Sequence, residues 1–141
     1  LTLEIIGPLF DRRIASRLNG HHDGVTYHRQ PSNVLELMLS ADVAVSGGGQ
    51  TTYELAATGT PTIAVRLADN QTRNLQGFRS AGAVVWAGDA TDPLLGERIT
   101  TELKALAQDE LRRGRLSANG RGMVDGRGAN RVARWILDRR P

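Results

Sequence analysis

The sequence predicts an α/β fold with three layers: a parallel sheet of about five strands, helices on both of its faces, and extra helices at the C-terminal end. Apolar runs of strand length alternate with helical segments from Leu1 to Gly88. Such alternation requires crossover connections, which make the strands parallel. The strand segments are also near-continuous apolar and β-branched runs, a pattern typical of sheets that are buried on both faces.

The individual elements follow from local signals. We expect strands at residues 1–6, 25–28, 42–46, 62–67 and 83–88. Turn residues end the intervening helices: Asn19-Gly20 ends the first, Gly59 with Pro61 ends the third, and Gly82 ends the fourth. We expect the helices at residues 10–18, 33–41, 52–59 and 72–82, and then at 93–108, 109–118 and 129–139.

Length and composition narrow the class of protein. The 141 residues suffice for one domain, so we expect residues 1–141 to form a single one. We find no apolar run of bilayer length and no signal-peptide pattern, so we expect a cytoplasmic protein without an integral membrane segment. The lack of cysteine excludes disulfides, thiol catalysis and cysteine metal sites. Because the chain begins at Leu1 rather than at methionine, we expect it to be part of a longer protein.

The formal net charge is +3, and the basic excess lies between Arg98 and Arg140. Arginine and acidic side chains can share solvated helix faces. Alternatively, the basic helices can favour nucleic acid, an anionic membrane surface or an acidic partner domain. Aromatic residues make up only 4% of the chain, too few for stacking along single strands, and we expect no nucleic acid partner.

The carboxyl ends of the predicted strands should open on one rim, which is where ligands bind in parallel sheets. The segment Ser46-Gly47-Gly48-Gly49-Gln50 lies there, between a strand and the helix that Thr51 opens. Free amides at a helix start bind anions such as phosphate, and glycine lets the anion reach the backbone. Alternatively, the glycines serve only a tight turn, and Thr51 and Glu54 form a capping box.

Familiar phosphate and metal motifs do not fit this chain. A Walker loop would need a lysine after the glycines, and none is near. The dinucleotide fingerprint would need glycine where Thr52 stands, so we expect no nicotinamide or other cofactor. His21, His22 and Asp23 lie in a turn away from the rim and make a poor metal cluster. We expect neither a metal site nor a serine–histidine–acid triad.

Two stretches resemble a known family: "LMLSADVAVSGGGQTTYELAATGTPTIAVRLADNQ" and the later "GMVDGRGANRV". The chain resembles the C-terminal, Rossmann-like domain of the nucleotide-sugar enzymes of GT-B fold. In particular it resembles the UDP-sugar hydrolase of pseudaminic acid biosynthesis and its spore-coat polysaccharide relatives. The N-acetylglucosaminyltransferase of peptidoglycan precursor synthesis is a more distant relative. The likeness extends from about Leu1 to Val132.

The resemblance implies a UDP-sugar site, and it assigns each role to positions of this chain. Glu54 would accept hydrogen bonds from the ribose hydroxyls, which suits a carboxylate, unless it only caps its helix. Asn70 and Gln71 would face the sugar, unless they only cap the next helix. Tyr53 is expected to be packed. The diphosphate would be held by Ser46, Gly47, Gly48, Gly49, Gln50, Thr51 and Thr52, and the base by Gln30, Pro31 and Ser32, although Pro31 has no N–H to offer.

The resemblance also implies a reaction that needs a second domain. In the hydrolase branch water attacks the sugar–diphosphate linkage, and the general base, a histidine, belongs to an N-terminal domain that this sequence lacks. We therefore assign no catalytic residue here. A glycosyltransferase donor domain is one alternative, and a non-catalytic module that docks a partner through its basic helices is another. The residues that motivate the docking module are Arg112, Arg113, Arg115, Arg121 and Arg127.

Domains of this family begin with one more strand, which lies centrally, before the strand that matches residues 1–6. Without it we expect a gap in the sheet, with unpaired backbone groups on both sides. The two neighbouring strands would close up, another chain would fill the gap, or the full protein would supply the strand. We favour the last of these.

Overall fold

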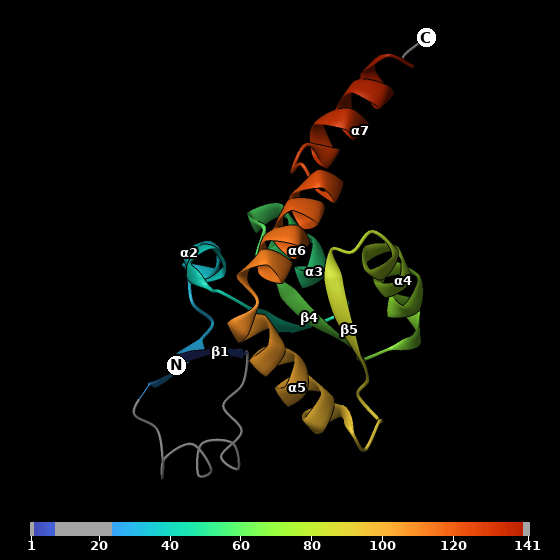
Figure 1. Ribbon diagram of the computed structural model, residues 1–141. Helices are drawn as coiled ribbons and strands as arrows, with labels where there is room; N and C mark the ends of the chain where they lie inside the picture. The colour runs from blue at the N-terminus through green and yellow to red at the C-terminus, as the bar shows by residue number, and fades with distance from the viewer. Residues whose placement is uncertain (1, 8–23, 140–141) are drawn as a thin grey trace. The chain divides into compact units, whose positions relative to one another are not determined.

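The computed structural model describes residues 2–7 and 24–139. The chain forms two compact units, Leu1–Leu37 and Met38–Pro141, and each has its own parallel sheet. Figure 1 shows the helices and strands of both. The predicted α/β fold of Rossmann-like type is confirmed. The helix predicted at residues 10–18 and the turn at 21–23 lie outside the described residues.

The described part of the first unit contains two strands. β1 (Leu3–Gly7) pairs in parallel with β2 (Val25–Arg29). Between these strands, His28 Nε2 lies 2.5 Å from Glu4 Oε2. The helix α2 (Val34–Ser40) follows β2 and crosses the boundary between the two units.

The sheet of the second unit has the order β3-β4-β5, with all strands parallel. The strands are β3 (Ala44–Gly47), β4 (Thr62–Arg66) and β5 (Val84–Asp89). The central strand β4 is the most buried of the three, because helices cover both of its faces. Its residues Ile63 and Ala64 are fully shielded from solvent. This burial explains why the strand reads as a continuous apolar run.

The helices of the second unit are α3 (Thr51–Thr58), α4 (Thr72–Ser80), α5 (Leu95–Gln108), α6 (Glu110–Met123) and α7 (Gly128–Leu137), with a short 3₁₀ turn η1 (Asp69–Gln71) before α4. The first four of these helices form two layers around the sheet. One core cluster joins α3 and α4 to the sheet, through Ala56, Ala64, Leu75, Phe78, Ala83 and Val84. The other joins α5 and α6 to the opposite face, through Ile63, Ala87, Leu106 and Leu116.

The bounds of these elements lie within a few residues of the predicted ones, apart from α6, which continues to Met123. Helix α3 ends as expected on Gly59, which has the left-handed φ of 75° that glycine adopts at low cost. The pairing differs from the prediction in one respect, because the described strands form two sheets rather than one. β1 and β3 each pair with a single strand among the described residues.

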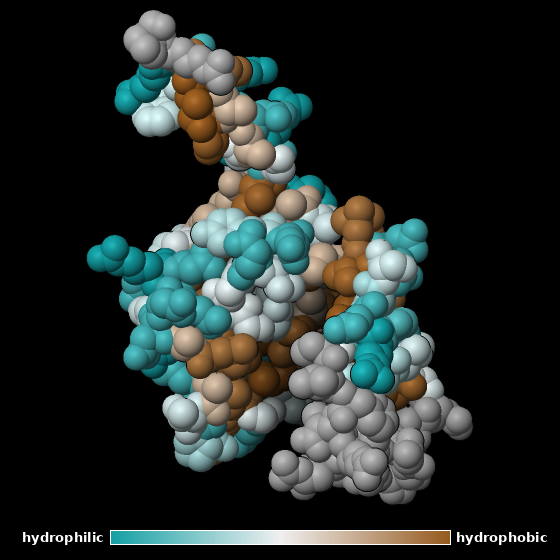
Figure 2. Space-filling view, turned by 180° about the vertical axis from the view of Figure 1, so that it is seen from behind, coloured by the Kyte–Doolittle hydropathy of each residue, from teal (hydrophilic) through white to brown (hydrophobic). Residues whose placement is uncertain are grey.

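Helix α7 is exposed along its whole described length. Its apolar side chains Val132, Trp135, Ile136 and Leu137 are all more than half exposed. Figure 2 shows apolar surface along this helix. Nothing in the described part of the chain combines the length and the apolar character that a bilayer-crossing helix requires.

Candidate functional site

The glycine loop leaves the carboxyl end of β3 and turns at once into α3. It stays beside the sheet, because the Gly48 N–H donates to the Val65 carbonyl at 2.8 Å. Packing against the buried Leu75 explains Gly48, whereas Gly47 meets only the exposed side chain of Leu67. A Cβ at Gly47 would lie 2.6 Å from a methyl carbon of Leu67, and one at Gly48 would lie 2.6 Å from two carbons of Leu75.

Gly49 is different, because a Cβ there would meet only the side-chain amide nitrogen of Gln71, at 3.4 Å. Its φ also lies outside the left-handed region that favours glycine. Packing and backbone strain therefore do not require glycine at this position. Close approach of a ligand to the backbone remains a reason for it.

The start of α3 leaves backbone donors free. Gln50 is the N-cap residue, and its side chain makes no capping hydrogen bond. The amides of Thr52 and Tyr53 donate to Gly49 and Gln50 carbonyls at 3.2 and 2.9 Å. Within the described residues, no acceptor faces the amides of Gly49, Gln50 and Thr51. Such a row of free donors at the positive end of a helix dipole favours an anion.

The capping box considered for this helix does not form. The N-cap is Gln50 rather than Thr51, and in the described part of the chain the Glu54 carboxylate has no hydrogen bond. Glu54 is exposed, one turn into α3. It is therefore available to a ligand.

One residue of the predicted site points inward. The Thr52 side chain is 1% exposed, and its hydroxyl donates back to the Gly47 carbonyl at 3.3 Å. Its amide is engaged as well, so in this structure Thr52 shapes the loop. Tyr53, which we expect to be packed, is 42% exposed, and its ring forms a T-shaped contact with that of Phe78, with ring centroids 5.1 Å apart.

The turn between β4 and α4 lies next to the glycine loop, as the contact between Gln71 and Gly49 shows. Asn70 is exposed, and its side chain has no partner among the described residues. The Gln71 side chain does not cap α4. Its Oε1 instead accepts from the Leu67 N–H at 2.8 Å, which closes the turn. The structure thus brings the predicted diphosphate and sugar residues together.

The predicted base residues belong to the first unit, directly after β2. Gln30 has a left-handed φ of 49°, the only positive φ of a non-glycine residue in the described part of the chain. Gln30 and Ser32 are exposed, and Pro31 is half-buried. Their role stays a prediction.

Sequence reasoning missed two features that hold this site. The first is Asn74 on α4, whose side-chain amide donates to the Gly48 carbonyl at 2.8 Å. The second is an ion pair between Arg66 and Asp89, at the ends of β4 and β5. Arg66 donates from Nε to Oδ1 at 2.7 Å and from Nη2 to Oδ2 at 2.5 Å. The signal for this pair in the sequence is that a charged residue stands at or near the end of each of two successive strand segments.

The ion pair changes the titration of both groups. The hydrogen bond from Arg66 lowers the pKa of Asp89, and the charge of Arg66 adds to this effect. The same hydrogen bond raises the pKa of Arg66, with further contributions from the charges of Asp89 and Asp69. Both shifts favour the charged forms, so the pair persists throughout the neutral range.

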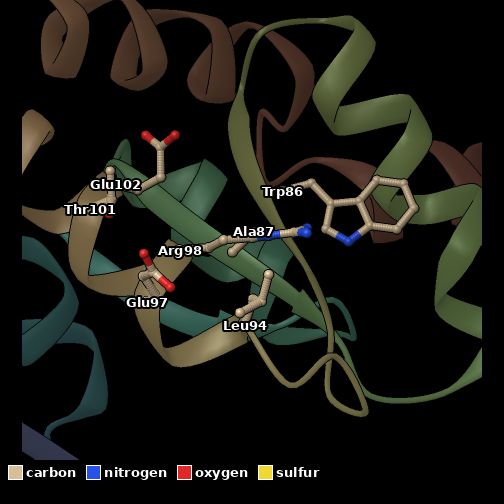
Figure 3. Close-up of a pocket in the computed structure, with 7 residues that line it drawn as sticks. All are labelled: Trp86, Ala87, Leu94, Glu97, Arg98, Thr101 and Glu102. Carbon is tan, nitrogen blue, oxygen red and sulfur yellow. The ribbon is translucent and has the colours of Figure 1, made fainter.

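A hollow of about 390 Å³ lies elsewhere, between α5 and β5. Figure 3 shows Glu97, Arg98 and Glu102 of α5 beside it. Two of these side chains are already paired, Arg98 with Asp92 at 3.1 Å and Glu102 with Arg112 at 2.8 Å. The hollow shares no residue with the glycine loop. Among the described residues, no group of three histidine and acidic side chains is placed to hold a metal ion.

Comparison with known proteins gives one distant similarity for this chain. No family model matches the chain. The spore coat polysaccharide biosynthesis protein SpsG of Bacillus subtilis (strain 168) is 29% identical over 114 residues. This chain is a distant, partial homologue of a polysaccharide biosynthesis protein. The match covers 77% of this chain and 32% of SpsG, so the chain spans about a third of the length of that relative.

Proposed function

We propose that this chain binds a nucleotide-diphosphate sugar, with UDP as the nucleotide. The observation that carries the proposal is the row of free amides at Gly49, Gln50 and Thr51, at the start of α3. These donors would bind the diphosphate. The exposed carboxylate of Glu54 lies one turn further along the helix, at a suitable place to accept from the ribose hydroxyls. The homology to a polysaccharide biosynthesis protein supports a sugar nucleotide as the ligand.

The sugar would extend toward the turn that carries Asn70 and Gln71. Both side chains present amide groups, which donate to and accept from hydroxyl or acetamido groups. Gln71 uses its oxygen within the turn and keeps its nitrogen beside Gly49. That nitrogen would therefore donate where the diphosphate passes into the sugar.

In the whole protein we propose hydrolysis of the sugar–diphosphate linkage, with the general base on another domain. A glycosyltransferase is the alternative reaction. The docking module receives less support, because Arg112 pairs with Glu102 and Arg113 donates to the Leu106 and Ala107 carbonyls. Those two arginines join α5 to α6. Incubation of the full-length protein with UDP-sugar distinguishes the reactions, since only a hydrolase releases sugar when no acceptor is present.

A titration with UDP tests the binding. We expect backbone NMR shifts at Gly49, Gln50 and Thr51, with saturation at or below millimolar concentration. Absence of these shifts would rule the proposal out.

In Glu54→Ala we expect UDP to bind about tenfold more weakly, because hydrogen bonds to a charged group are lost. The same substitution should change the affinity for 2′-deoxy-UDP less. The control substitution Glu110→Ala, in the first turn of α6, should change the affinity for neither ligand.

A further inference from the structure

The turn that carries Asn70 and Gln71 has little packing to define its shape. Leu67 is 62% exposed, and Ala68 to Asn70 are exposed as well. A short exposed turn of this kind takes many conformations unless polar contacts select one. Hydrogen bonds must therefore hold this turn in a single conformation.

Two of these bonds come from Arg66, the last residue of β4. Its Nη1 donates to Asp69 Oδ1 at 3.2 Å and to Thr72 Oγ1 at 3.2 Å. The first acceptor begins η1 and the second begins α4. Arg66 thus joins both ends of the segment that presents Asn70 and Gln71.

Asp89 in turn holds the guanidinium group of Arg66 through two parallel hydrogen bonds. Bidentate pairing sets the plane of the guanidinium as well as its position. The side chain of Arg66 is 28% exposed and that of Asp89 is 36% exposed. Ion pairs this accessible to water contribute little to global stability. Loss of the pair should therefore disturb the position of the Arg66 guanidinium more than it lowers the stability of the fold.

A β-bulge creates the pair. Ala64 lies opposite Trp86 but Val65 lies opposite Gly88, so β5 contains one extra residue. The shift brings Asp89 opposite Arg66, where a regular ladder would have placed Gly88. Gly88 has a φ of 137°, which side-chain-bearing residues rarely adopt. Bulges near binding sites commonly re-aim a side chain in this way.

We propose that Arg66, held by Asp89, is a positioning residue that sets affinity for the sugar part of the ligand. This inference rests on the proposed function. Arg66 fixes the turn, and the turn presents the amides of Asn70 and Gln71. Loss of Arg66 should therefore weaken recognition of the sugar and leave recognition of the nucleotide diphosphate intact.

Calorimetric titration with two probes, UDP and UDP-N-acetylglucosamine, tests the proposal. The measured quantity is the ratio of the two dissociation constants. In Arg66→Met we expect UDP affinity to stay within about twofold of wild type, while the preference for the sugar nucleotide falls about five- to tenfold, as for the loss of one hydrogen bond. Arg66→Lys should behave like Arg66→Met, because an ammonium cannot reproduce the bidentate pair. Arg131→Met removes the arginine–aspartate pair with Asp125, next to α7, and should change neither constant.

Asp89→Asn is the second variant, in case Arg66→Met does not fold, and it should lose the same preference. Amide hydrogen exchange, measured by NMR, accompanies both titrations. The Leu67 amide, which donates to Gln71, should exchange faster in the variants, while the Gly48 amide should remain protected. If both variants bind UDP and keep the wild-type ratio, the positioning role is wrong and the proposed function stands. Equal affinity of wild type for the two probes overturns the role as well. If wild type binds neither probe, both proposals fail.

Discussion

The side-chain amide of Asn74 donates to the carbonyl oxygen of Gly48, 26 residues earlier, at 2.8 Å. This bond joins α4 to the glycine loop. It supplies a partner for the carbonyl of Gly48, a residue that is buried. The loop that presents the free amides of α3 is therefore held by a residue of the neighbouring helix.

Removal of that donor should loosen the loop. In Asn74→Ala the Gly48 carbonyl loses its partner, and we expect the free energy of unfolding to fall by about 1–2 kcal/mol. The same variant should also bind UDP more weakly than wild type. Denaturant unfolding and calorimetry measure the two effects. Arg73→Ala, next to it on the exposed side of α4, should stay within about 0.5 kcal/mol of wild type. Equal losses in the two variants would contradict this role for Asn74.

The glycines should separate into structural and ligand-facing positions. Gly48→Ala places a Cβ against Leu75, which is fully buried, so we expect a loss of about 1–3 kcal/mol in stability. Gly49→Ala meets only the Gln71 amide nitrogen and should keep most of the stability. We expect Gly49→Ala to weaken UDP binding nevertheless, because its Cβ covers the free amides. Thermal unfolding and UDP titration of both variants check this. Wild-type UDP affinity in Gly49→Ala would show that the ligand does not approach there.

The Arg66–Asp89 pair should make a small contribution to the pH dependence of stability. Arg66 lowers the folded-state pKa of Asp89, so the unfolded state binds the proton more readily. The stability from this pair is present above the ordinary aspartate pKa of about 3.9. It is lost as pH falls through the lowered folded-state value.

Denaturant unfolding between neutral pH and about pH 2 measures that loss. Wild type should lose more stability than Asp89→Asn over the acid part of this range. Adding Arg66→Met to Asp89→Asn should change the acid slope no further, since the pair is already absent. A wild-type slope in Asp89→Asn would mean that other carboxyl groups account for the acid sensitivity.

The exposed apolar face of α7 should contribute little to the stability of this chain. Val132→Ser and Ile136→Asn alter side chains that are 59% and 52% exposed, and each should stay within about 0.5 kcal/mol of wild type. Leu106→Ala, at a fully buried position of α5, should cost about 2–5 kcal/mol. Chemical denaturation of the three variants makes the comparison. A large loss in Ile136→Asn would show that α7 packs against the rest of the chain in solution.

The sequence by itself determined the order of the described elements and the place of the glycine loop. Both depend on local signals. β4 is a continuous apolar run because helices cover both of its faces, and α3 ends where Gly59 can adopt a left-handed φ. Each of these features is encoded within a few neighbouring residues. Prediction from the chain alone therefore succeeded there.

The tertiary structure decided which residues hold the site. Arg66 meets Asp89 only because a bulge shifts the register by one residue, and Asn74 meets Gly48 only because α4 packs beside the loop. Thr51 and Glu54 matched a capping box locally, yet the chain enters α3 one residue earlier, at Gln50. Contacts of this kind join residues far apart in the chain, and their geometry depends on strand register and helix packing. No local pattern contains that information.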